Sequence, residues 1–190
     1  MGLDQFLERC DRKAYGYKNF NIDEIKENNV KLYNEIKPFL VNRGEHIHWE
    51  SIFSPVGYWR KANAVHRWFV ENVQDGEDDC GTYEVNKEQL EELLSICELI
   101  KDKCKLVKGK VNNGQYFENG KWVTEYVDGQ VLDNQDIAEA YLPTQSGFFF
   151  GCTDYDEYYL DDINDTIDIL TNALETTDFD TQMIVYSSSW

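Results

Sequence analysis

The chain has 190 residues, a formal net charge of −18 at pH 7, and 42% hydrophobic and 14% aromatic residues. This aromatic content is typical of a globular protein with a buried core, and it excludes an acidic disordered chain. The negative charge disfavours binding to anionic membranes and direct binding to DNA or RNA, most strongly for the C-terminal third. No apolar run approaches the roughly 20 residues that cross a bilayer, so we expect one cytoplasmic domain over residues 1–190.

The cysteines form an odd set without a C-x-x-C pair, which favours reduced thiols packed as small core residues over a redox or metal role. They are Cys10, Cys80, Cys97, Cys104 and Cys152. Cys97 and Cys104 are seven residues apart and would share one face of a predicted helix.

The first quarter of the chain has the weakest patterns. Residues 3–9 roughly alternate and predict a strand, and residues 14–20 predict its hairpin partner, although a short helix fits almost as well. Residues 21–44 carry a weak helical pattern that Pro38 should end, and they allow a polar N-terminal extension. Residues 45–53 predict another strand.

Residues 58–70 predict a helix, because apolar side chains recur there at three- and four-residue spacing. The expected buried stripe comprises Tyr58, Ala62, Val65, Phe69 and Val73. The remaining faces carry the one basic cluster of the chain, formed by Arg60, Lys61 and Arg67 with Asn63. We expect this basic face to dock against the acidic C-terminal third, within one molecule or across a homodimer.

The middle of the chain combines clear strand, helix and turn signals. Residues 82–85 predict a short strand, and Asn86 with Gln89 forms a capping-box pattern that opens a helix ending near Cys104. Residues 105–132 are rich in Val and aromatic residues and contain three dipeptides that favour positive φ and two-residue turns, which predicts a β-meander. These dipeptides are Asn113-Gly114, Asn119-Gly120 and Asp128-Gly129.

Residues 133–141 predict a short helix, and residues 147–151, three phenylalanines between glycines, predict a buried strand. A long helix follows with Asp154 as its cap, and residues 182–188 predict a closing strand. The apolar stripe of the long helix comprises Tyr159, Ile163, Ile167, Leu170 and Leu174. The expected fold class is therefore α+β: a mostly antiparallel sheet of the meander, an N-terminal hairpin and the C-terminal strand, packed by three main helices.

Almost all of the net charge lies in the last third of the chain. Residues 122–190 contain fifteen acidic side chains and no Lys or Arg, whereas the first 121 residues contain 18 basic and 21 acidic side chains. On the predicted long helix the acids stand about 6 Å apart along the axis, without a basic residue at i+4. They form the predicted partner-binding surface, which comprises Asp154, Asp156, Glu157, Asp161, Asp165 and Asp168.

The simplest interpretation of this surface is a solvated face, but solubility does not require sixty-nine positions without a basic residue. A nucleic-acid strand presents one phosphate per ~3.4 Å of axis, and the stripe with its neighbouring acids approaches that density. The surface therefore predicts competition with nucleic acid for a basic channel. No cofactor is expected, and the alternative is a divalent metal at Asp154, Asp156 and Glu157, where the glycine and terminal glutamate of an EF-hand are missing.

Histidines offer the other candidates for chemistry. His46 and His48 would share one face of a strand and, with His66, are able to form a divalent metal site. Arg60, Asn63 and His66 follow at i, i+3 and i+6, a pattern able to hold a phosphate and to supply a proton carrier. The simpler interpretation is a helix with a polar edge and one satisfied histidine. The sequence has no G-x-S-x-G elbow and no glycine-rich phosphate loop.

Several motifs together resemble a family of small, largely uncharacterised acidic proteins from phages and mobile elements of Gram-positive bacteria. The motifs are the MGLD start, YWRKANAVHRWF at residues 58–69, LPTQSGFFFG at 142–151, DYDEYY at 154–159 and the final YSSSW. The resemblance covers most of residues 45–190 and implies a setting in the cytoplasm of a bacterial host. Proteins from this setting often inhibit host defence, and they include anti-CRISPR proteins that act on RNA-guided nucleases.

The leading hypothesis is an inhibitor whose acidic surface engages a basic channel of a host nucleic-acid-handling protein, such as an RNA-guided nuclease. The alternative is a nucleotide- or RNA-processing enzyme, or a nucleotide-binding sponge, that uses Arg60, Asn63 and His66. A third hypothesis is a structural accessory protein that self-associates through its basic and acidic faces.

Overall fold

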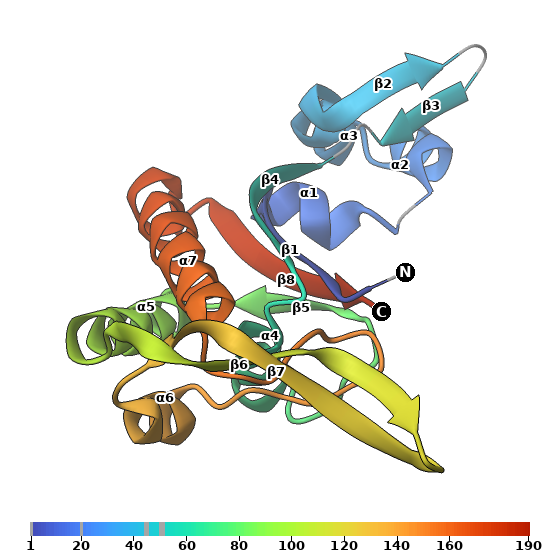
Figure 1. Cartoon of the computed structure of the whole chain (residues 1–190). Coiled ribbons are helices and arrows are strands. Elements are labelled where there is room, and N and C mark those ends of the chain that lie inside the picture. The colour runs from blue at the N-terminus through green and yellow to red at the C-terminus, as the bar shows by residue number, and fades with distance from the viewer. Residues whose placement is uncertain (1, 20, 44–45, 50–51) are drawn as a thin grey trace.

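The computed structural model describes residues 2–19, 21–43, 46–49 and 52–190, and it has the expected α+β architecture. The main body is built on a four-stranded antiparallel sheet in the order β4-β1-β8-β5 (Figure 1). The first and last strands of the chain pair with each other at the centre of this sheet, and the strands predicted at 3–9, 82–85 and 182–188 are confirmed. The four strands are β1 (Asp4–Asp11), β4 (Phe53–Arg60), β5 (Thr82–Val85) and β8 (Gln182–Ser189).

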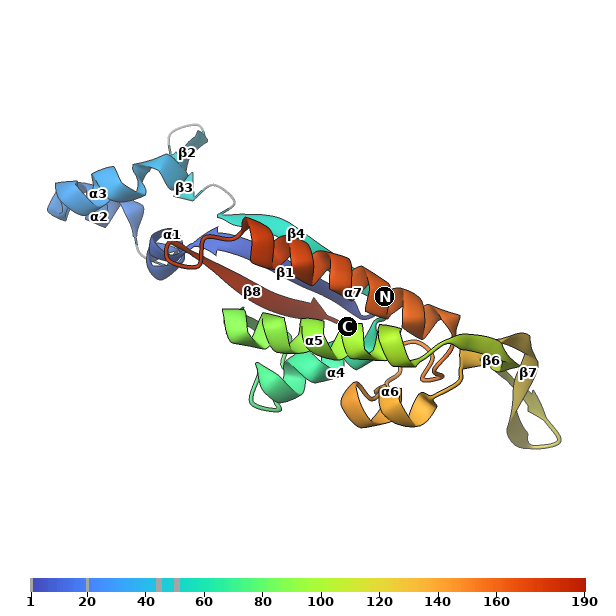
Figure 2. The same cartoon turned by 90° about the vertical axis from the view of Figure 1, so that its left-hand side faces the viewer.

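Three long helices pack against the sheet and enclose the core, as the sequence predicted. Figure 2 shows α5 and α7 running side by side along the sheet, and the two helices are in contact. Their inner faces bury Leu93 and Ile163, and α4 adds Val65 and Phe69 to the same cluster. The three helices are α4 (Asn63–Asn72), α5 (Lys87–Lys103) and α7 (Glu157–Thr176).

Side-chain caps fix where two of these helices begin. The amide N–H of Gln89 donates to Asn86 Oδ1 at 2.8 Å, and that of Asn86 donates to Gln89 Oε1 at 2.9 Å, which completes the predicted capping box. The cap of α7 is Asp156 and not Asp154, because Asp156 Oδ1 accepts the N–H groups of Tyr158 and Tyr159. Asp154 Oδ2 instead accepts the N–H of a hairpin residue at 3.0 Å, so the predicted cap was wrong by two residues.

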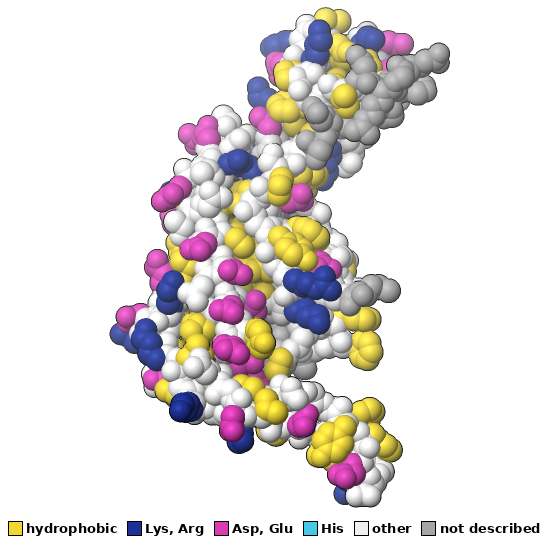
Figure 3. All heavy atoms as spheres, turned by 45° about the horizontal axis from the view of Figure 1, so that its top comes forward, with side chains coloured by type: hydrophobic (Ala, Val, Ile, Leu, Met, Phe, Trp, Pro, Cys, Tyr) yellow, Lys and Arg dark blue, Asp and Glu magenta, His cyan; other side chains and the backbone are white. Residues whose placement is uncertain are grey.

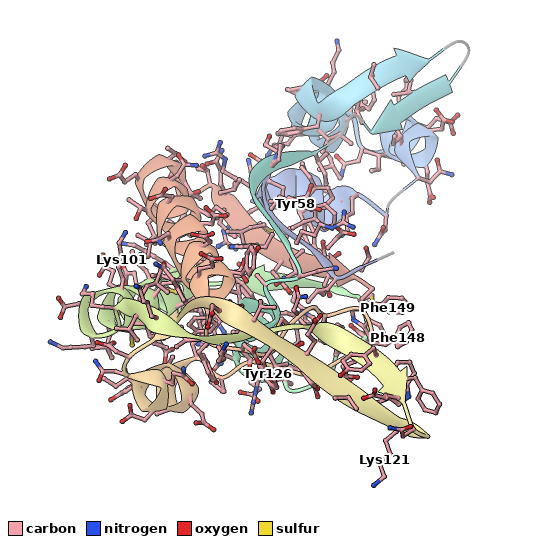
Figure 4. All side chains as sticks on the ribbon, in the orientation of Figure 1. Tyr58, Lys101, Lys121, Tyr126, Phe148 and Phe149 are labelled. Atoms are coloured by element: carbon pink, nitrogen blue, oxygen red, sulfur yellow. The ribbon has the colours of Figure 1, made fainter. Side chains whose placement is uncertain are left out.

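Residues 105–132 form one long hairpin rather than the predicted meander. The strands β6 (Leu106–Glu118) and β7 (Lys121–Leu132) meet at Asn119-Gly120, where both residues have the positive φ of a two-residue turn. Asn113-Gly114 lies in an irregularity of β6, and Asp128-Gly129 lies within β7. An Asn-Gly or Asp-Gly pair permits a turn without requiring one. Figure 4 shows Lys121 at the far end of this hairpin, which projects from the body.

Residues 14–20 do not form the predicted second strand of an N-terminal hairpin. Helix α1 (Arg12–Tyr17) occupies most of this segment, because Asp11 Oδ1 accepts the N–H groups of Lys13 and Ala14 and caps the helix. Phe20 lies outside the described residues.

A small lobe stands apart from the main body in Figure 1. It confirms the helical pattern predicted for residues 21–44, which ends in a 3₁₀ turn that contains Pro38. The strand predicted at 45–53 is divided between this lobe and β4. The elements of the lobe are α2 (Ile22–Asn28), α3 (Val30–Ile36), the 3₁₀ turn Lys37–Phe39, β2 (Leu40–Arg43) and β3 (His46–Trp49).

The helix predicted from residue 58 begins five residues later. Tyr58 and Arg60 belong to β4, Lys61 takes a left-handed φ of 63°, and α4 starts at Asn63. Tyr58 is half-exposed and does not lie in a buried stripe. Pairing of β4 with β1 holds these residues in a strand, and spacing along the chain does not reveal such a long-range contact.

Residues 147–151 form an irregular loop and not the predicted buried strand. Phe150 is buried, but Phe148 is 93% exposed and lies beside Phe149 at the edge of the molecule (Figure 4). The short helix predicted before this loop is confirmed as α6 (Gln135–Tyr141).

Replacement of Gly57 by Ala is expected to lower the free energy of unfolding by about 1–3 kcal/mol, because β4 passes closely under α7 at this residue. A Cβ atom at Gly57 would overlap the Ile169 side chain. Urea denaturation measures the loss, and Ser54→Ala on an exposed part of the same strand is the control. An unchanged midpoint in Gly57→Ala would show that this helix–strand contact is looser than described.

Candidate functional site

A cleft of about 440 Å³ lies where the start of α7 faces the link between β4 and α4. Five predicted site residues meet in this cleft, although the sequence assigned them to two separate sites: Arg60, Asn63, Asp154, Asp156 and Asp161. The complete lining consists of Arg60, Lys61, Asn63, Ala64, Thr144, Gly151, Cys152, Asp154, Asp156, Tyr158, Tyr159, Asp161 and Asp162.

The outer side of α7 carries a row of acids that we call the acidic face. Its side chains are exposed, and none takes part in an ion pair within the part of the chain that the structure describes. Figure 3 shows Asp and Glu side chains gathered in a row, with Lys and Arg side chains to either side. The acidic face comprises Glu157, Asp161, Asp165 and Asp168.

Asn63 holds the loop that closes one side of the cleft. Its Nδ2 group donates to the carbonyl oxygens of Phe150 at 3.1 Å and Cys152 at 2.7 Å, and its Oδ1 accepts the N–H of Gln145 at 3.0 Å. The side chain is almost fully buried and its hydrogen-bonding groups are occupied. The catalytic prediction required Asn63 to be free to bind a substrate. The side chain instead holds the loop in place, so this prediction is wrong for Asn63.

The predicted basic face is divided in the structure. Arg60 Nη1 lies 3.9 Å from Asp4 Oδ1, and Arg67 Nε donates to Glu71 Oε1 at 2.7 Å on α4. Lys61 has no ion-pair partner among the residues that the structure places. Arg60 and Lys61 face the acids of α7 across the cleft, so basic and acidic groups meet within one molecule.

His66 is fully buried away from the cleft lining. Its Nδ1 lies 2.8 Å from Tyr186 Oη, and its Nε2 lies 2.9 Å from Asp78 Oδ2. Tyr186 Oη also donates to Gln5 Oε1 at 3.0 Å, and Asp78 Oδ1 accepts from Trp190 Nε1 at 3.1 Å. The predicted catalytic set of Arg60, Asn63 and His66 is therefore not assembled. His66 belongs to a buried polar network between α4 and β8.

Asp162 lies in the cleft and was not among the predicted site residues, although it is one of the neighbouring acids that were counted toward the charge density of the stripe. Burial, reinforced by repulsion from Asp165, Asp161 and Asp156, raises the pKa of its carboxyl to about 7. Burial likewise raises the pKa of Asp156, opposed by the N–H groups that this carboxylate accepts. The sequence feature that could have identified Asp162 is the Asp161-Asp162 pair, because the second of two adjacent acids on this helix lies toward its inner side.

The wild-type protein is expected to lose stability as the pH rises from about 4 to about 7 through Asp162. In this window the folded state still binds the proton that the unfolded carboxyl, with its usual pKa of 3.8, has released. Asp162→Asn removes this effect, so it should be more stable than wild type by about 1–3 kcal/mol at pH 8 and equal to it near pH 4. Denaturant titrations across this pH range measure the difference, with the exposed Glu92→Gln as control. A constant difference at all pH values would contradict the assignment.

Within the described residues, no group of three or more His, Cys, Asp or Glu side chains is placed to hold a metal ion. The predicted metal site rests on His46 and His48, whose backbone lies in β3 but whose side chains are outside the described residues. The third candidate ligand, His66, is bonded through both ring nitrogens.

All five cysteines are free. Cys10, Cys97 and Cys104 are buried in the core as expected, and burial raises the pKa of the Cys97 thiol to about 12. The prediction of core packing is wrong for Cys80 and Cys152, which are exposed, and Cys152 lines the cleft.

The hairpin end carries exposed aromatic side chains that sequence reasoning did not select as a site. Phe117 and Trp122 pair across the strands with their rings in an edge-on arrangement and remain more than 60% exposed. Tyr126 lies further along β7 and is 58% exposed (Figure 4). Exposed aromatic clusters of this kind are typical of protein-binding surfaces.

The chain matches no protein-family model, no curated protein and no solved structure. Among the described helices, none combines the length and the apolar character that crossing a membrane requires.

Proposed function

We propose that this chain is a binding protein that inhibits a host nucleic-acid-handling protein, such as an RNA-guided nuclease. Its acidic face would occupy the basic channel that normally holds nucleic acid. One observation carries the proposal: Glu157, Asp161, Asp165 and Asp168 stand exposed on one side of a 20-residue helix without ion-pair partners among the described residues.

Helix geometry supports the comparison with a phosphate backbone. Four residues of α-helix rise about 6 Å and three rise about 4.5 Å, so the acidic face offers carboxylates at steps of about 5–6 Å along one side of the helix. Such a surface, held in place on a rigid helix, would release counterions from a basic groove as nucleic acid does. Core packing on the inner side of α7 holds this line, because Tyr159, Ile163 and Leu170 are buried there.

The enzymatic alternative has lost its supporting geometry. His66 is buried and hydrogen-bonded on both sides, and Asn63 is engaged with loop carbonyl groups. The motifs that resemble phage and mobile-element proteins support a setting in which inhibitors of host defence occur. An anti-CRISPR role is the specific form of the proposal that this setting favours.

Cleavage of target DNA by a purified, guide-loaded nuclease from a Gram-positive bacterium tests the proposal. We expect the wild-type protein to inhibit cleavage, and Asp161→Asn, Asp165→Asn and Asp168→Asn together to weaken inhibition by about 10–100-fold. Each substitution keeps the side-chain shape and removes one charge.

The matched control changes the same number of charges elsewhere on the surface. Glu92, Glu98 and Glu139 are exposed on α5 and α6, and their joint replacement by Gln should leave inhibition unchanged. Lack of inhibition by wild-type protein, or equal loss in both triple variants, would overturn the proposal.

A further inference from the structure

The hairpin formed by β6 and β7 carries a free strand edge away from the body of the protein. Figure 2 shows the hairpin extending beyond the helices, and its two strands form a sheet of their own. Within the described residues, the backbone of residues 121–130 makes no backbone–backbone hydrogen bond outside the hairpin. An isolated two-stranded hairpin is only marginally stable in water, and an unpaired edge is a template for another strand. This hairpin is therefore suited to accept a further strand.

The outer edge of β7 is better suited to such pairing than the outer edge of β6. The register of β6 is irregular between Asn112 and Gln115, and the N–H of Asn112 already donates to Asp154. β7 runs without such an interruption until Val131, which bridges to Asp156. Extra residues in a strand bend its edge and interrupt a ladder of hydrogen bonds, so β7 offers the longer regular edge.

The turn of the hairpin determines which backbone groups of β7 face outward. At the two-residue turn Asn119-Gly120, the flanking residues Glu118 and Lys121 form the first hydrogen-bonded pair. Alternate residues after Lys121 then direct their N–H and C=O groups away from β6 and toward the free edge. These residues are Trp122, Thr124 and Tyr126.

The charges of β7 are complementary to those of a second copy that runs in the opposite direction. Lys121 stands at the start of the strand, and Glu125 follows four residues later on the same face. Neither takes part in an ion pair among the residues that the structure places, although Glu125 Oε2 accepts Asn113 Nδ2 at 2.8 Å. Antiparallel pairing centred on Thr124 brings each Lys121 diagonally across from Glu125 of the second copy.

The exposed aromatic side chains of the hairpin favour the same register. Pairing centred on Thr124 places Trp122, which is 69% exposed, directly opposite Tyr126 of the second copy, which is 58% exposed. Phe117 packs beside Trp122 and extends the cluster. Two such clusters form in one dimer, so aromatic side chains that face water in the single chain become covered.

The neighbouring registers fit less well. A centre at Glu125 would place two glutamates opposite each other, and the turn would reach the base of β7, where the edge is already occupied. A centre at Val123 would place Trp122 opposite Thr124 and remove the aromatic pairs. With the centre at Thr124, the turn of one copy lies beside residues 128–129 of the other, just before the occupied segment.

We infer that the protein forms a homodimer through antiparallel pairing of the outer edges of β7, with the two-fold axis at Thr124. The paired segment, residues 120–128 of each copy, is about 30 Å long, a size typical of weak and reversible complexes. A two-fold axis requires a surface that is complementary to itself, as this edge is. The dimer differs from the predicted self-association through basic and acidic faces. It also goes beyond the proposed function, because β7 is separate from the acidic face.

Charge exchange on β7 tests the pairing by sedimentation equilibrium of the full-length protein, for which we expect a reversible monomer–dimer equilibrium in wild type. Lys121→Glu alone and Glu125→Lys alone should each weaken the dimer by about tenfold, because each places like charges across the axis twice. An equimolar mixture of the two variants should recover the wild-type affinity, since opposite charges face each other again in the mixed dimer. Lys108→Glu, on the exposed base of β6, is the control and should leave the affinity unchanged.

Disulfide trapping tests the register independently. Cys80 and Cys152 are exposed, so both are first replaced by Ser. Thr124→Cys should then cross-link two copies under mild oxidation, because the two Cα atoms at the axis would lie about 5.5 Å apart. Gln115→Cys is the control, because it lies on β6 opposite Thr124 and its two copies would be about 14 Å apart.

Four results would overturn the β7 dimer. The first is a wild-type protein that remains monomeric at about 500 μM. The others are equal effects of Lys121→Glu and Lys108→Glu, no recovery of affinity in the mixture, and equal cross-linking through Thr124→Cys and Gln115→Cys.

Discussion

His66→Ala is expected to lower the free energy of unfolding by about 3–5 kcal/mol. The substitution removes the imidazole partner from the buried Tyr186 Oη and from the partly buried Asp78 Oδ2. It also opens a cavity beside Phe150, whose ring packs against the imidazole with centroids 5.2 Å apart. Chemical denaturation measures the loss.

The direction of the hydrogen bonds explains why this network is sensitive. Gln5 Nε2 donates to the carbonyl oxygen of Ala62, so its Oε1 accepts the single hydroxyl proton of Tyr186. His66 completes this chain with both of its ring nitrogens, because Nδ1 lies at Tyr186 Oη and Nε2 at Asp78 Oδ2.

Tyr186→Phe is the control for His66→Ala, because it removes the hydroxyl but keeps the ring stacked on Phe69 at 3.9 Å. Its cost should be about 1–2 kcal/mol, clearly smaller than that of the histidine variant. A loss below about 1 kcal/mol in His66→Ala would contradict the role of the network and reopen the question of a functional histidine.

Asn63→Ala is the second substitution with a large expected effect, about 2–4 kcal/mol, because it releases all three hydrogen bonds of a buried side chain at once. The loop from residue 144 to residue 152 then loses three of its hydrogen bonds to α4, and one wall of the cleft loosens. Limited digestion with chymotrypsin should therefore cut after the exposed Phe148 much faster than in wild type.

Asn164→Ala provides the comparison, because the Asn164 side chain donates only to the carbonyl oxygen of Leu160 within its own helix. Its digestion rate at Phe148 should match that of wild type. Equal cleavage rates in Asn63→Ala and wild type would mean that the loop is held by other contacts.

The sequence was most informative where local chemistry decides structure. The capping box at Asn86 and Gln89 and the apolar stripe from Tyr159 to Leu170 predicted α5 and α7, because these signals act within a few residues. The sequence was least informative where pairing with a distant strand determines the secondary structure of a segment. Trp59 is held in β4 by pairing with Gln5, and this contact overrides the helical pattern that begins at Tyr58.

The candidate site shows the same contrast between what local patterns predict and what only the tertiary structure determines. Exposure of Asp161, Asp165 and Asp168 follows from their positions opposite the apolar stripe, so the sequence placed them correctly on an outer face. The cleft joins residues about one hundred positions apart, and no local pattern reveals such a meeting. Asn63 and His66 were selected as chemical groups because they are polar, yet burial gives both a structural role.

Carboxyl labelling with a carbodiimide and a small amine, read by mass spectrometry, tests whether the partner covers the acidic face. The acidic face should be labelled in the free protein and protected in the complex with the inhibited nuclease, whereas Glu92, Glu98 and Glu139 should be labelled equally in both. Equal labelling of Glu157, Asp161, Asp165 and Asp168 in the free and bound states would show that the partner does not cover this helix, and would contradict the account.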